Sequence, residues 1–156
     1  MAPLIILIVA FVLIFAANRF FLSGRLSISQ IGRYALALMM LVAGISHFTA
    51  TGTEVMTQMM PDVIPYKREL VYFTGVCELA AVPGLIFERT SRLTAIMLII
   101  FFMAVLPANI AGSLKQVNYS GMEYGALYLL FRVPLQMLFI WWAWYFGLRK
   151  NRDVTS

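Results

Sequence analysis

The sequence has little of what most catalytic and metal sites are built from. Its 156 residues include one cysteine, Cys77, and one histidine, His47. A single cysteine excludes an internal disulfide and a CxxC redox pair. A single histidine excludes a metal site with several imidazoles, or a bis-histidine haem, within one chain. Haem, flavin, iron–sulfur and nucleotide motifs are also absent, so no intrinsic cofactor is predicted.

Charged residues are scarce as well. They make up 12% of the chain, whereas 62% of the chain is hydrophobic. Soluble domains contain about 25% charged and about 45–50% apolar residues, so both departures indicate an integral membrane protein. The net charge of +5 could indicate nucleic-acid binding. The basic residues lie between apolar runs and not on one soluble face, so no nucleic-acid partner is expected.

Five apolar segments are long enough to cross a bilayer as helices. They cover residues 2–22, 31–48, 70–87, 93–110 and 126–148. A hydrocarbon core of about 30 Å requires roughly 17–25 helical residues. Pro83 and Pro107 fall inside two of the segments, where membrane helices tolerate proline. The predicted fold class is therefore all-α, a polytopic bundle of five transmembrane helices.

The first segment resembles a signal peptide in its apolar content. It has no basic residue before the apolar run and no convincing small-x-small cleavage site, so we interpret it as a retained helix. Because it is apolar on all sides, we expect it at the periphery of the bundle, facing lipid.

The basic residues predict the orientation. Three of them, Lys67, Arg68 and Lys115, lie on one side of the proposed bundle. Eight lie on the other side, namely Arg19, Arg25, Arg33, Arg89, Arg92, Arg149, Lys150 and Arg152. The positive-inside rule then places the N-terminus outside and the C-terminus in the cytoplasm.

The loop of residues 49–69 is expected to contain a short amphipathic helix over the outer mouth of the bundle. A capping-box pattern at residues 51–54 is followed by Val55, Met56, Met59 and Met60 at helical spacing. Pro61 ends the pattern. The helix is either an ordinary interfacial element or a lid that gates the bundle.

Four polar side chains are predicted to meet in the outer half of the bundle. A charge at membrane depth costs about 2.5–3.5 kcal/mol on insertion scales. Glu78 lies roughly 12 Å into the third segment, and Arg132 lies roughly 9 Å into the fifth, at about 1.5 Å per residue. His47 ends the second segment and Asn109 ends the fourth, both on the outer side.

Two further patterns refine this cluster. Tyr124, Tyr128, Arg132 and Gln136 recur every four residues, which predicts one polar stripe along the fifth helix. Gly75 precedes Glu78 by three residues, where it would let a neighbouring helix or a ligand come close.

The polar residues have a structural as well as a functional interpretation. Glu78 and Arg132 could form an ion pair that fixes helix register, or Arg132 could extend to the lipid headgroups. His47 and Asn109 could simply hydrogen-bond carbonyl groups at helix ends. Alternatively the cluster is a functional site, which is the default hypothesis for intramembrane ionisable residues.

Four stretches carry a resemblance to a known family. They are Ala-Gly-Ile-Ser-His-Phe at 43–48, Met-Met-Pro-Asp-Val-Ile-Pro at 59–65, Val-Tyr-Phe-Thr-Gly-Val-Cys-Glu at 71–78 and Leu-Pro-Ala-Asn-Ile at 106–110. In this order they resemble the DoxX family of small prokaryotic membrane proteins, from about residue 33 to residue 148. That family has a four-helix core. The resemblance thus divides the chain into an extra helix with a basic loop (1–30), a four-helix bundle (31–148) and a basic cytoplasmic tail (149–156).

The resemblance implies a function as well as a fold. The family is named for a subunit of a thiosulfate:quinone oxidoreductase, and its fold is similar to that of the sterol-isomerase group. We therefore expect a protein of the prokaryotic inner membrane that binds a hydrophobic small molecule, with quinone as the candidate cofactor, as the membrane subunit of an oxidoreductase. Its partners would be the lipid bilayer, this small molecule and a second oxidoreductase subunit.

Roles for the residues follow from this expectation. Glu78 and His47 would be catalytic and handle protons, while Asn109, Arg132, Gln136 and Tyr128 would bind the ligand. In this functional interpretation the methionine and aromatic residues would line its tail, whereas in the structural interpretation they face lipid or the core: Met39, Met40, Met97, Met103, Phe101 and Phe102. The alternatives are a stand-alone acid–base enzyme that modifies lipids, such as an isomerase, and a non-catalytic scaffold or binding protein. A transporter is disfavoured because no inverted repeat is visible.

Overall fold

The computed structural model describes residues 2–117 and 122–148, and all the regular elements in this part of the chain are helices. Its long helices are α1 (Ala2–Phe20), α2 (Ile28–Ser46), α4 (Lys67–Ile86), α5 (Glu88–Leu114) and α6 (Ala126–Gly147). The short elements are α3 (Ala50–Met59) and a 3₁₀ turn, η1 (Met122–Tyr124). All five long helices are apolar and long enough to span a membrane, so the predicted fold class is confirmed. The predicted basic tail at 149–156 lies outside the described residues.

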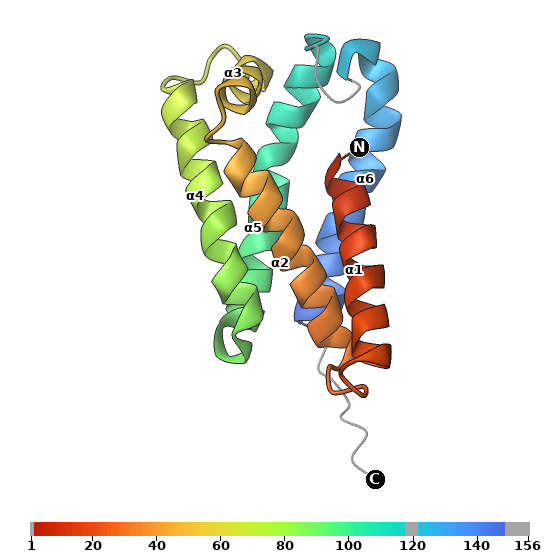
Figure 1. Ribbon diagram of the computed structural model, residues 1–156. Coiled ribbons are helices and arrows are strands. Elements are labelled where there is room, and N and C mark those ends of the chain that lie inside the picture. The colour runs from red at the N-terminus through yellow and green to blue at the C-terminus, as the bar shows by residue number, and fades with distance from the viewer. Residues whose placement is uncertain (1, 118–121, 149–156) are drawn as a thin grey trace.

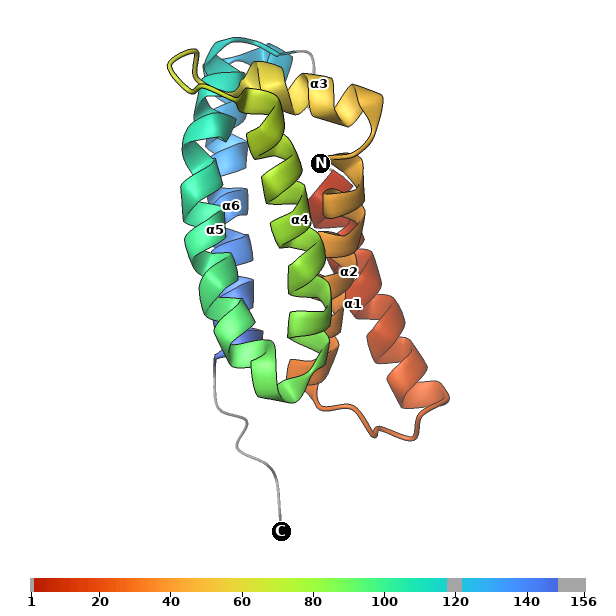
Figure 2. The ribbon, with the colours of Figure 1, turned by 90° about the vertical axis from the view of Figure 1, so that its left-hand side faces the viewer.

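The long helices form an elongated bundle with α3 lying across one end (Figure 1). Helix α2 is central and packs against α1, α4 and α6, while α5 packs against α4 and α6. The view from the side shows α3 covering the bundle at the end where α2 stops and α4 starts (Figure 2). We call this end the α3 end.

Helix α1 lies at the edge of the bundle against α2, as its uniformly apolar sequence predicted (Figure 1). Leu7 and Ala10 are buried against the core. The remaining faces of α1 present large apolar side chains to the surroundings, among them Ile5, Val9 and Leu13.

The end opposite α3 is held by polar contacts between helices. The Trp142 indole donates to the carbonyl of Gly32 at 3.0 Å, and the Ser29 hydroxyl donates to the carbonyl of Phe146 at 2.6 Å. These two bonds join α2 to α6. The Arg33 guanidinium joins α2 to α5 by donating to the Ser91 hydroxyl.

Two predicted element boundaries were wrong. Helix α5 was expected to end near Asn109, but it continues through Pro107 and Asn109 to Leu114. Asn109 therefore lies inside the helix, where its side-chain amide donates to the carbonyl of Val105 at 3.1 Å. Helix α3 is capped by Thr49 and not by Thr51, because it is the Thr49 hydroxyl that accepts from the backbone amide of Gly52 at 3.1 Å.

The loop after α3 is tied to both neighbouring helices by Asp62. Its carboxylate accepts from Lys115 Nζ at 2.7 Å and from Lys67 Nζ at 3.1 Å. The hydrogen bonds from Lys115 and then Lys67 hold the pKa of Asp62 below its ordinary value. The contribution of this carboxylate to stability is therefore complete above its unfolded-state pKa, and it is lost as the pH falls through the folded-state value.

Candidate functional site

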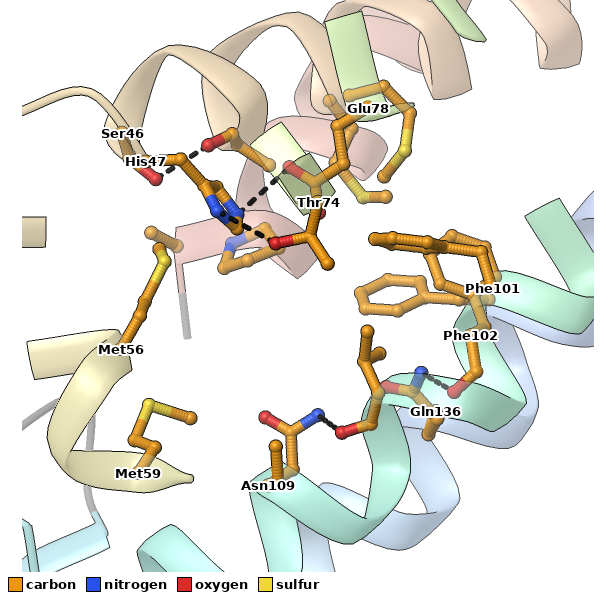
Figure 3. Close-up of a pocket in the computed structure, with 18 of the residues that line it drawn as sticks. Ser46, His47, Met56, Met59, Thr74, Glu78, Phe101, Phe102, Asn109 and Gln136 are labelled. Carbon is orange, nitrogen blue, oxygen red and sulfur yellow. Dashed lines mark hydrogen bonds and ion pairs between the residues drawn. The ribbon is translucent and has the colours of Figure 1, made fainter. Parts of the chain in front are cut away.

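A cavity of about 270 Å³ lies in the half of the bundle next to α3. All six helices and η1 contribute to its lining. Figure 3 shows its walls: His47, Thr74 and Glu78 lie on one side and Asn109 and Gln136 on the opposite side. The two remaining sides are apolar, with Met56 and Met59 facing Phe101 and Phe102 across the cavity (Figure 3).

The first polar wall is an ion pair between α2 and α4. His47 is the C-terminal cap of α2, and its Nε2 lies 3.3 Å from Oε2 of Glu78. Only 11% of either side chain is exposed. Gly75 makes this contact feasible, since a Cβ atom on Gly75 would lie 2.6 Å from Cβ of His47. The predicted role of Gly75, to admit a neighbouring helix, is confirmed.

The contacts of His47 determine which of its ring nitrogens carries a hydrogen and which one faces the carboxylate of Glu78. Nδ1 lies 2.8 Å from the carbonyl oxygen of Val71, which can only accept, so Nδ1 carries a hydrogen and donates it. Nε2 then faces Glu78. Without a proton between them, the nitrogen lone pair and the carboxylate would repel each other. A proton shared between them would join the two groups, as imidazolium with carboxylate or as imidazole with carboxylic acid.

The second polar wall comes from α5 and α6. Arg132 Nη2 donates to Oδ1 of Asn109 at 2.9 Å, and Gln136 Nε2 donates to the carbonyl of Phe102 at 2.6 Å. The buried hydroxyl of Tyr128 also lines the cavity and has no hydrogen-bond partner among the described residues. A polar ligand in the cavity would satisfy this hydroxyl.

The structure brings together all six residues proposed from the sequence: His47, Glu78, Asn109, Tyr128, Arg132 and Gln136 line one cavity. The alternative of an ion pair between Glu78 and Arg132 was wrong, because Glu78 pairs with His47 and the Arg132 guanidinium binds Asn109. Tyr124 does not extend the polar stripe, since it belongs to η1 and is 70% exposed.

The apolar lining differs in part from the expectation. Met39, Met40, Phe101 and Phe102 line the cavity as predicted. Met97 and Met103 do not line it, and both are about half exposed on the outer face of α5, as the alternative of lipid-facing positions predicted.

Other lining residues were not anticipated at all. They are Met122 in η1 and, at the start of α1, Ala2, Pro3 and Ile6. Helix α1 is apolar on every face, so its sequence carries no signal that one edge faces a cavity.

The described part of the chain contains no group of three or more His, Cys, Asp or Glu residues that could hold a metal ion. The polar residues that line the cavity suit an organic ligand: one His–Glu pair, one guanidinium, two amides and a phenol. Such convergent polar groups in an apolar cavity fix the orientation of a small molecule.

Comparison with known proteins identifies a family but no characterised relative. A search of curated proteins and a search of solved structures each found no match. The model of a family described as a domain of unknown function, DUF8561, matches residues 36–147. This region contains all six polar residues of the cavity and excludes α1. Since the match covers well over half of the chain, the protein belongs to the DUF8561 family.

Proposed function

We propose that this chain binds a hydrophobic small molecule with a polar head, the leading candidate being a quinone, as the DoxX-like membrane subunit of an oxidoreductase system. The proposed location is the prokaryotic cytoplasmic membrane, with the N-terminus outside. The α3 end then faces outward, so the cavity lies in the outer half of the bilayer.

The observation that carries the proposal is the pair of polar walls in an otherwise apolar cavity. The His47–Glu78 pair and the Asn109–Arg132 pair come from four different helices. His47 and Glu78 face Asn109 across the cavity (Figure 3). The lining between them is apolar and rich in methionine and phenylalanine. A flat head with oxygen atoms at both ends, such as a quinone ring, matches this arrangement of donors.

The chemistry of the two walls fits the reduction of a quinone. Conversion to a quinol takes up two electrons and two protons. In this proposal the partner subunit supplies the electrons, and the His47–Glu78 pair gives up its shared proton to one oxygen. Arg132 stabilises negative charge on the other oxygen, because a fixed cation acts strongly in a water-poor site. The second proton reaches the site from solvent at the α3 end.

The His47–Glu78 pair also supports a second candidate, a stand-alone acid–base enzyme that modifies a lipid. Such an enzyme needs two titratable groups around one pocket, which this pair provides. Turnover of a lipid by the purified protein, without any partner or electron donor, would favour this candidate.

Binding of a quinone probe to the reconstituted protein tests the proposal. We expect decyl-benzoquinone to bind wild type and to bind Glu78→Gln about tenfold more weakly, because a hydrogen bond to a charged group contributes about 1.5–3 kcal/mol. Glu69→Gln is the matched control, since Glu69 lies exposed on the first turn of the same helix. Native mass spectrometry and equilibrium titration measure the affinity.

Equal affinity in all three proteins would contradict a ligand head at Glu78 and leave the pair as a structural device. Thermal unfolding in detergent, measured for each variant, separates a local loss of binding from a loss of fold.

A further inference from the structure

The cavity has one wall that the family core does not provide. Helices α2 and α6 are joined at the end opposite α3, by the bonds from Trp142 to Gly32 and from Ser29 to Phe146. Towards the α3 end the two helices diverge (Figure 1). The cavity lies where they have separated, with Met39 and Ala43 of α2 on one side and Phe139 of α6 on the other.

Helix α1 lies across this gap. Its first two turns line the cavity through Ala2, Pro3 and Ile6. Its lower half is anchored: Phe11 packs against the rings of Trp142 and Phe146, with centroids 5.3 and 5.7 Å away. At its far end the Asn18 side chain exchanges two hydrogen bonds with the backbone of Leu26, at 2.9 and 3.0 Å.

The half of α1 nearer the α3 end is held by packing alone. Every side chain from Ala2 to Ala17 is apolar, so none can form a hydrogen bond with α2 or α6. In a bilayer there is no hydrophobic driving force between apolar helices, because lipid tails solvate them equally well. Exchange of these contacts for lipid contacts is therefore inexpensive, whereas the aromatic ring pairs of Phe11 contribute about 0.5–1.5 kcal/mol beyond the area that they bury.

We infer that the gap between α2 and α6 is a lateral portal to the bilayer, with the first two turns of α1 as its movable wall. The ligand is a long-chain amphiphile that enters sideways from the membrane. Its head occupies the polar cavity, and its chain leaves between α2 and α6 beneath α1. The inference rests on the proposed function only in taking the ligand to be an amphiphile.

The size and lining of the cavity favour a chain that exits. A cavity of about 270 Å³ is near the lower limit of about 300–1,000 Å³ for pockets that bind small molecules, so it has room for a head group but little for a long tail. The side next to α1 is lined by apolar groups, including Ile6, Met39 and Phe139. This is the lining that an alkyl or isoprenoid chain requires.

A photoactivatable lipid probe tests the portal independently of the head group. The full chain is reconstituted in phosphatidylcholine vesicles that contain a fatty acid with a diazirine at the end of its chain. Ultraviolet light releases dinitrogen from the probe, and the carbene inserts into a nearby C–H bond. Mass spectrometry of peptides then locates the label.

We expect label on Met39 and Phe139, which are buried from the outside but line the cavity, and none on Leu85, which is buried away from it. Ile6→Trp should lower the cavity label about tenfold, equivalent to about 1.4 kcal/mol. Ile6→Ala should raise it. Ile5→Trp is the matched control, because the adjacent Ile5 is 59% exposed and points away from the cavity.

Label confined to outward-facing residues such as Leu130 would overturn the portal, and so would equal cavity label in Ile6→Trp and Ile5→Trp. The outcome is separable from that of the proposed function. Cavity label without quinone binding would leave the portal standing and reject the quinone. Quinone binding without cavity label would place the entrance at the α3 end.

Discussion

Gly75 controls how closely His47 can approach α4. A Cβ atom at position 75 would lie 2.6 Å from Cβ and 3.0 Å from Cγ of His47, and 3.0 Å from a ring carbon of Phe48. His47 cannot retreat easily, because its ring is fixed by its bond to the carbonyl of Val71. The His47–Glu78 pair therefore depends on the absence of a side chain at position 75.

Gly75→Ala is expected to push His47 away from Glu78. Overpacking of a filled interior costs about 1–3 kcal/mol, and we expect a loss of stability in this range together with weaker binding of the quinone probe. Unfolding in detergent and equilibrium titration measure the two effects.

The double variant Gly75→Ala with His47→Gly removes the Cβ and ring atoms of His47 that the new methyl group meets. Its destabilisation should be smaller than the sum of the two single changes, since residues in contact do not act additively. Strict additivity would show that the methyl group and His47 do not meet.

Single residues of the site could be found from the sequence because charges and amides are rare in membrane helices. Glu78 and Arg132 stand out for this reason, and so do His47 and Asn109. Their pairing could not be found. Depth along a helix follows from residue count, but the partner depends on how each helix is rotated. The rotation of each helix about its own axis places Glu78 opposite His47 and Arg132 opposite Asn109.

At the scale of elements, the contact between α2 and α6 determines where the bundle is closed. The Trp142 indole reaches the carbonyl of Gly32, and a Cβ atom on Gly32 would lie only 2.2 Å from the ring of Phe146. Close approach of the backbones and a hydrogen bond thus act together at the end opposite α3. We call this contact of α6 with Gly32 the α2–α6 clamp. It holds the two helices together at one end while they separate around the cavity.

Trp142→Phe removes the hydrogen bond and retains an aromatic ring. We expect it to destabilise the protein by about 1–3 kcal/mol, because the buried carbonyl of Gly32 loses a partner. Trp144→Phe makes the same chemical change on the same helix at a half-exposed position, and it should have little effect. Unfolding of both variants in detergent provides the comparison, and equal losses would show that the clamp contributes nothing specific.

The existence and type of the elements followed from hydropathy, whereas their ends and their arrangement did not. The prediction for 93–110 covered the apolar part of α5, but the helix runs from Glu88 to Leu114 because polar residues continue it beyond the apolar stretch. The uniform apolarity of α1 predicted a peripheral position and concealed the edge that lines the cavity. The hydropathy pattern reveals a polar face on an otherwise apolar helix. It cannot reveal which side of a uniformly apolar helix lines a cavity.

At the scale of the whole molecule, the two ends differ in charge. At the α3 end, Lys67 and Lys115 are both paired with Asp62. At the opposite end Arg33 is paired with Glu88, and Arg19, Arg25, Arg89 and Arg92 lie in or next to the turns. Among the described residues, the α3 end thus carries three basic residues, these two lysines and Arg68, and the opposite end carries five. This asymmetry supports the proposed orientation, with the cavity opening nearer the outer surface.

Cysteine accessibility tests the orientation in a Cys77→Ser background, which removes the native thiol. Val63→Cys places a thiol in the loop after α3, at a position that is 89% exposed, and Ser23→Cys places one in the exposed turn between α1 and α2. In intact cells a membrane-impermeant maleimide should label Val63→Cys and spare Ser23→Cys, and permeabilisation should make both reactive. The reverse labelling pattern would show that the molecule has the opposite orientation in the membrane. The cavity would then draw its protons from the cytoplasm, and the partner that supplies electrons would have to dock at the α3 end from that side.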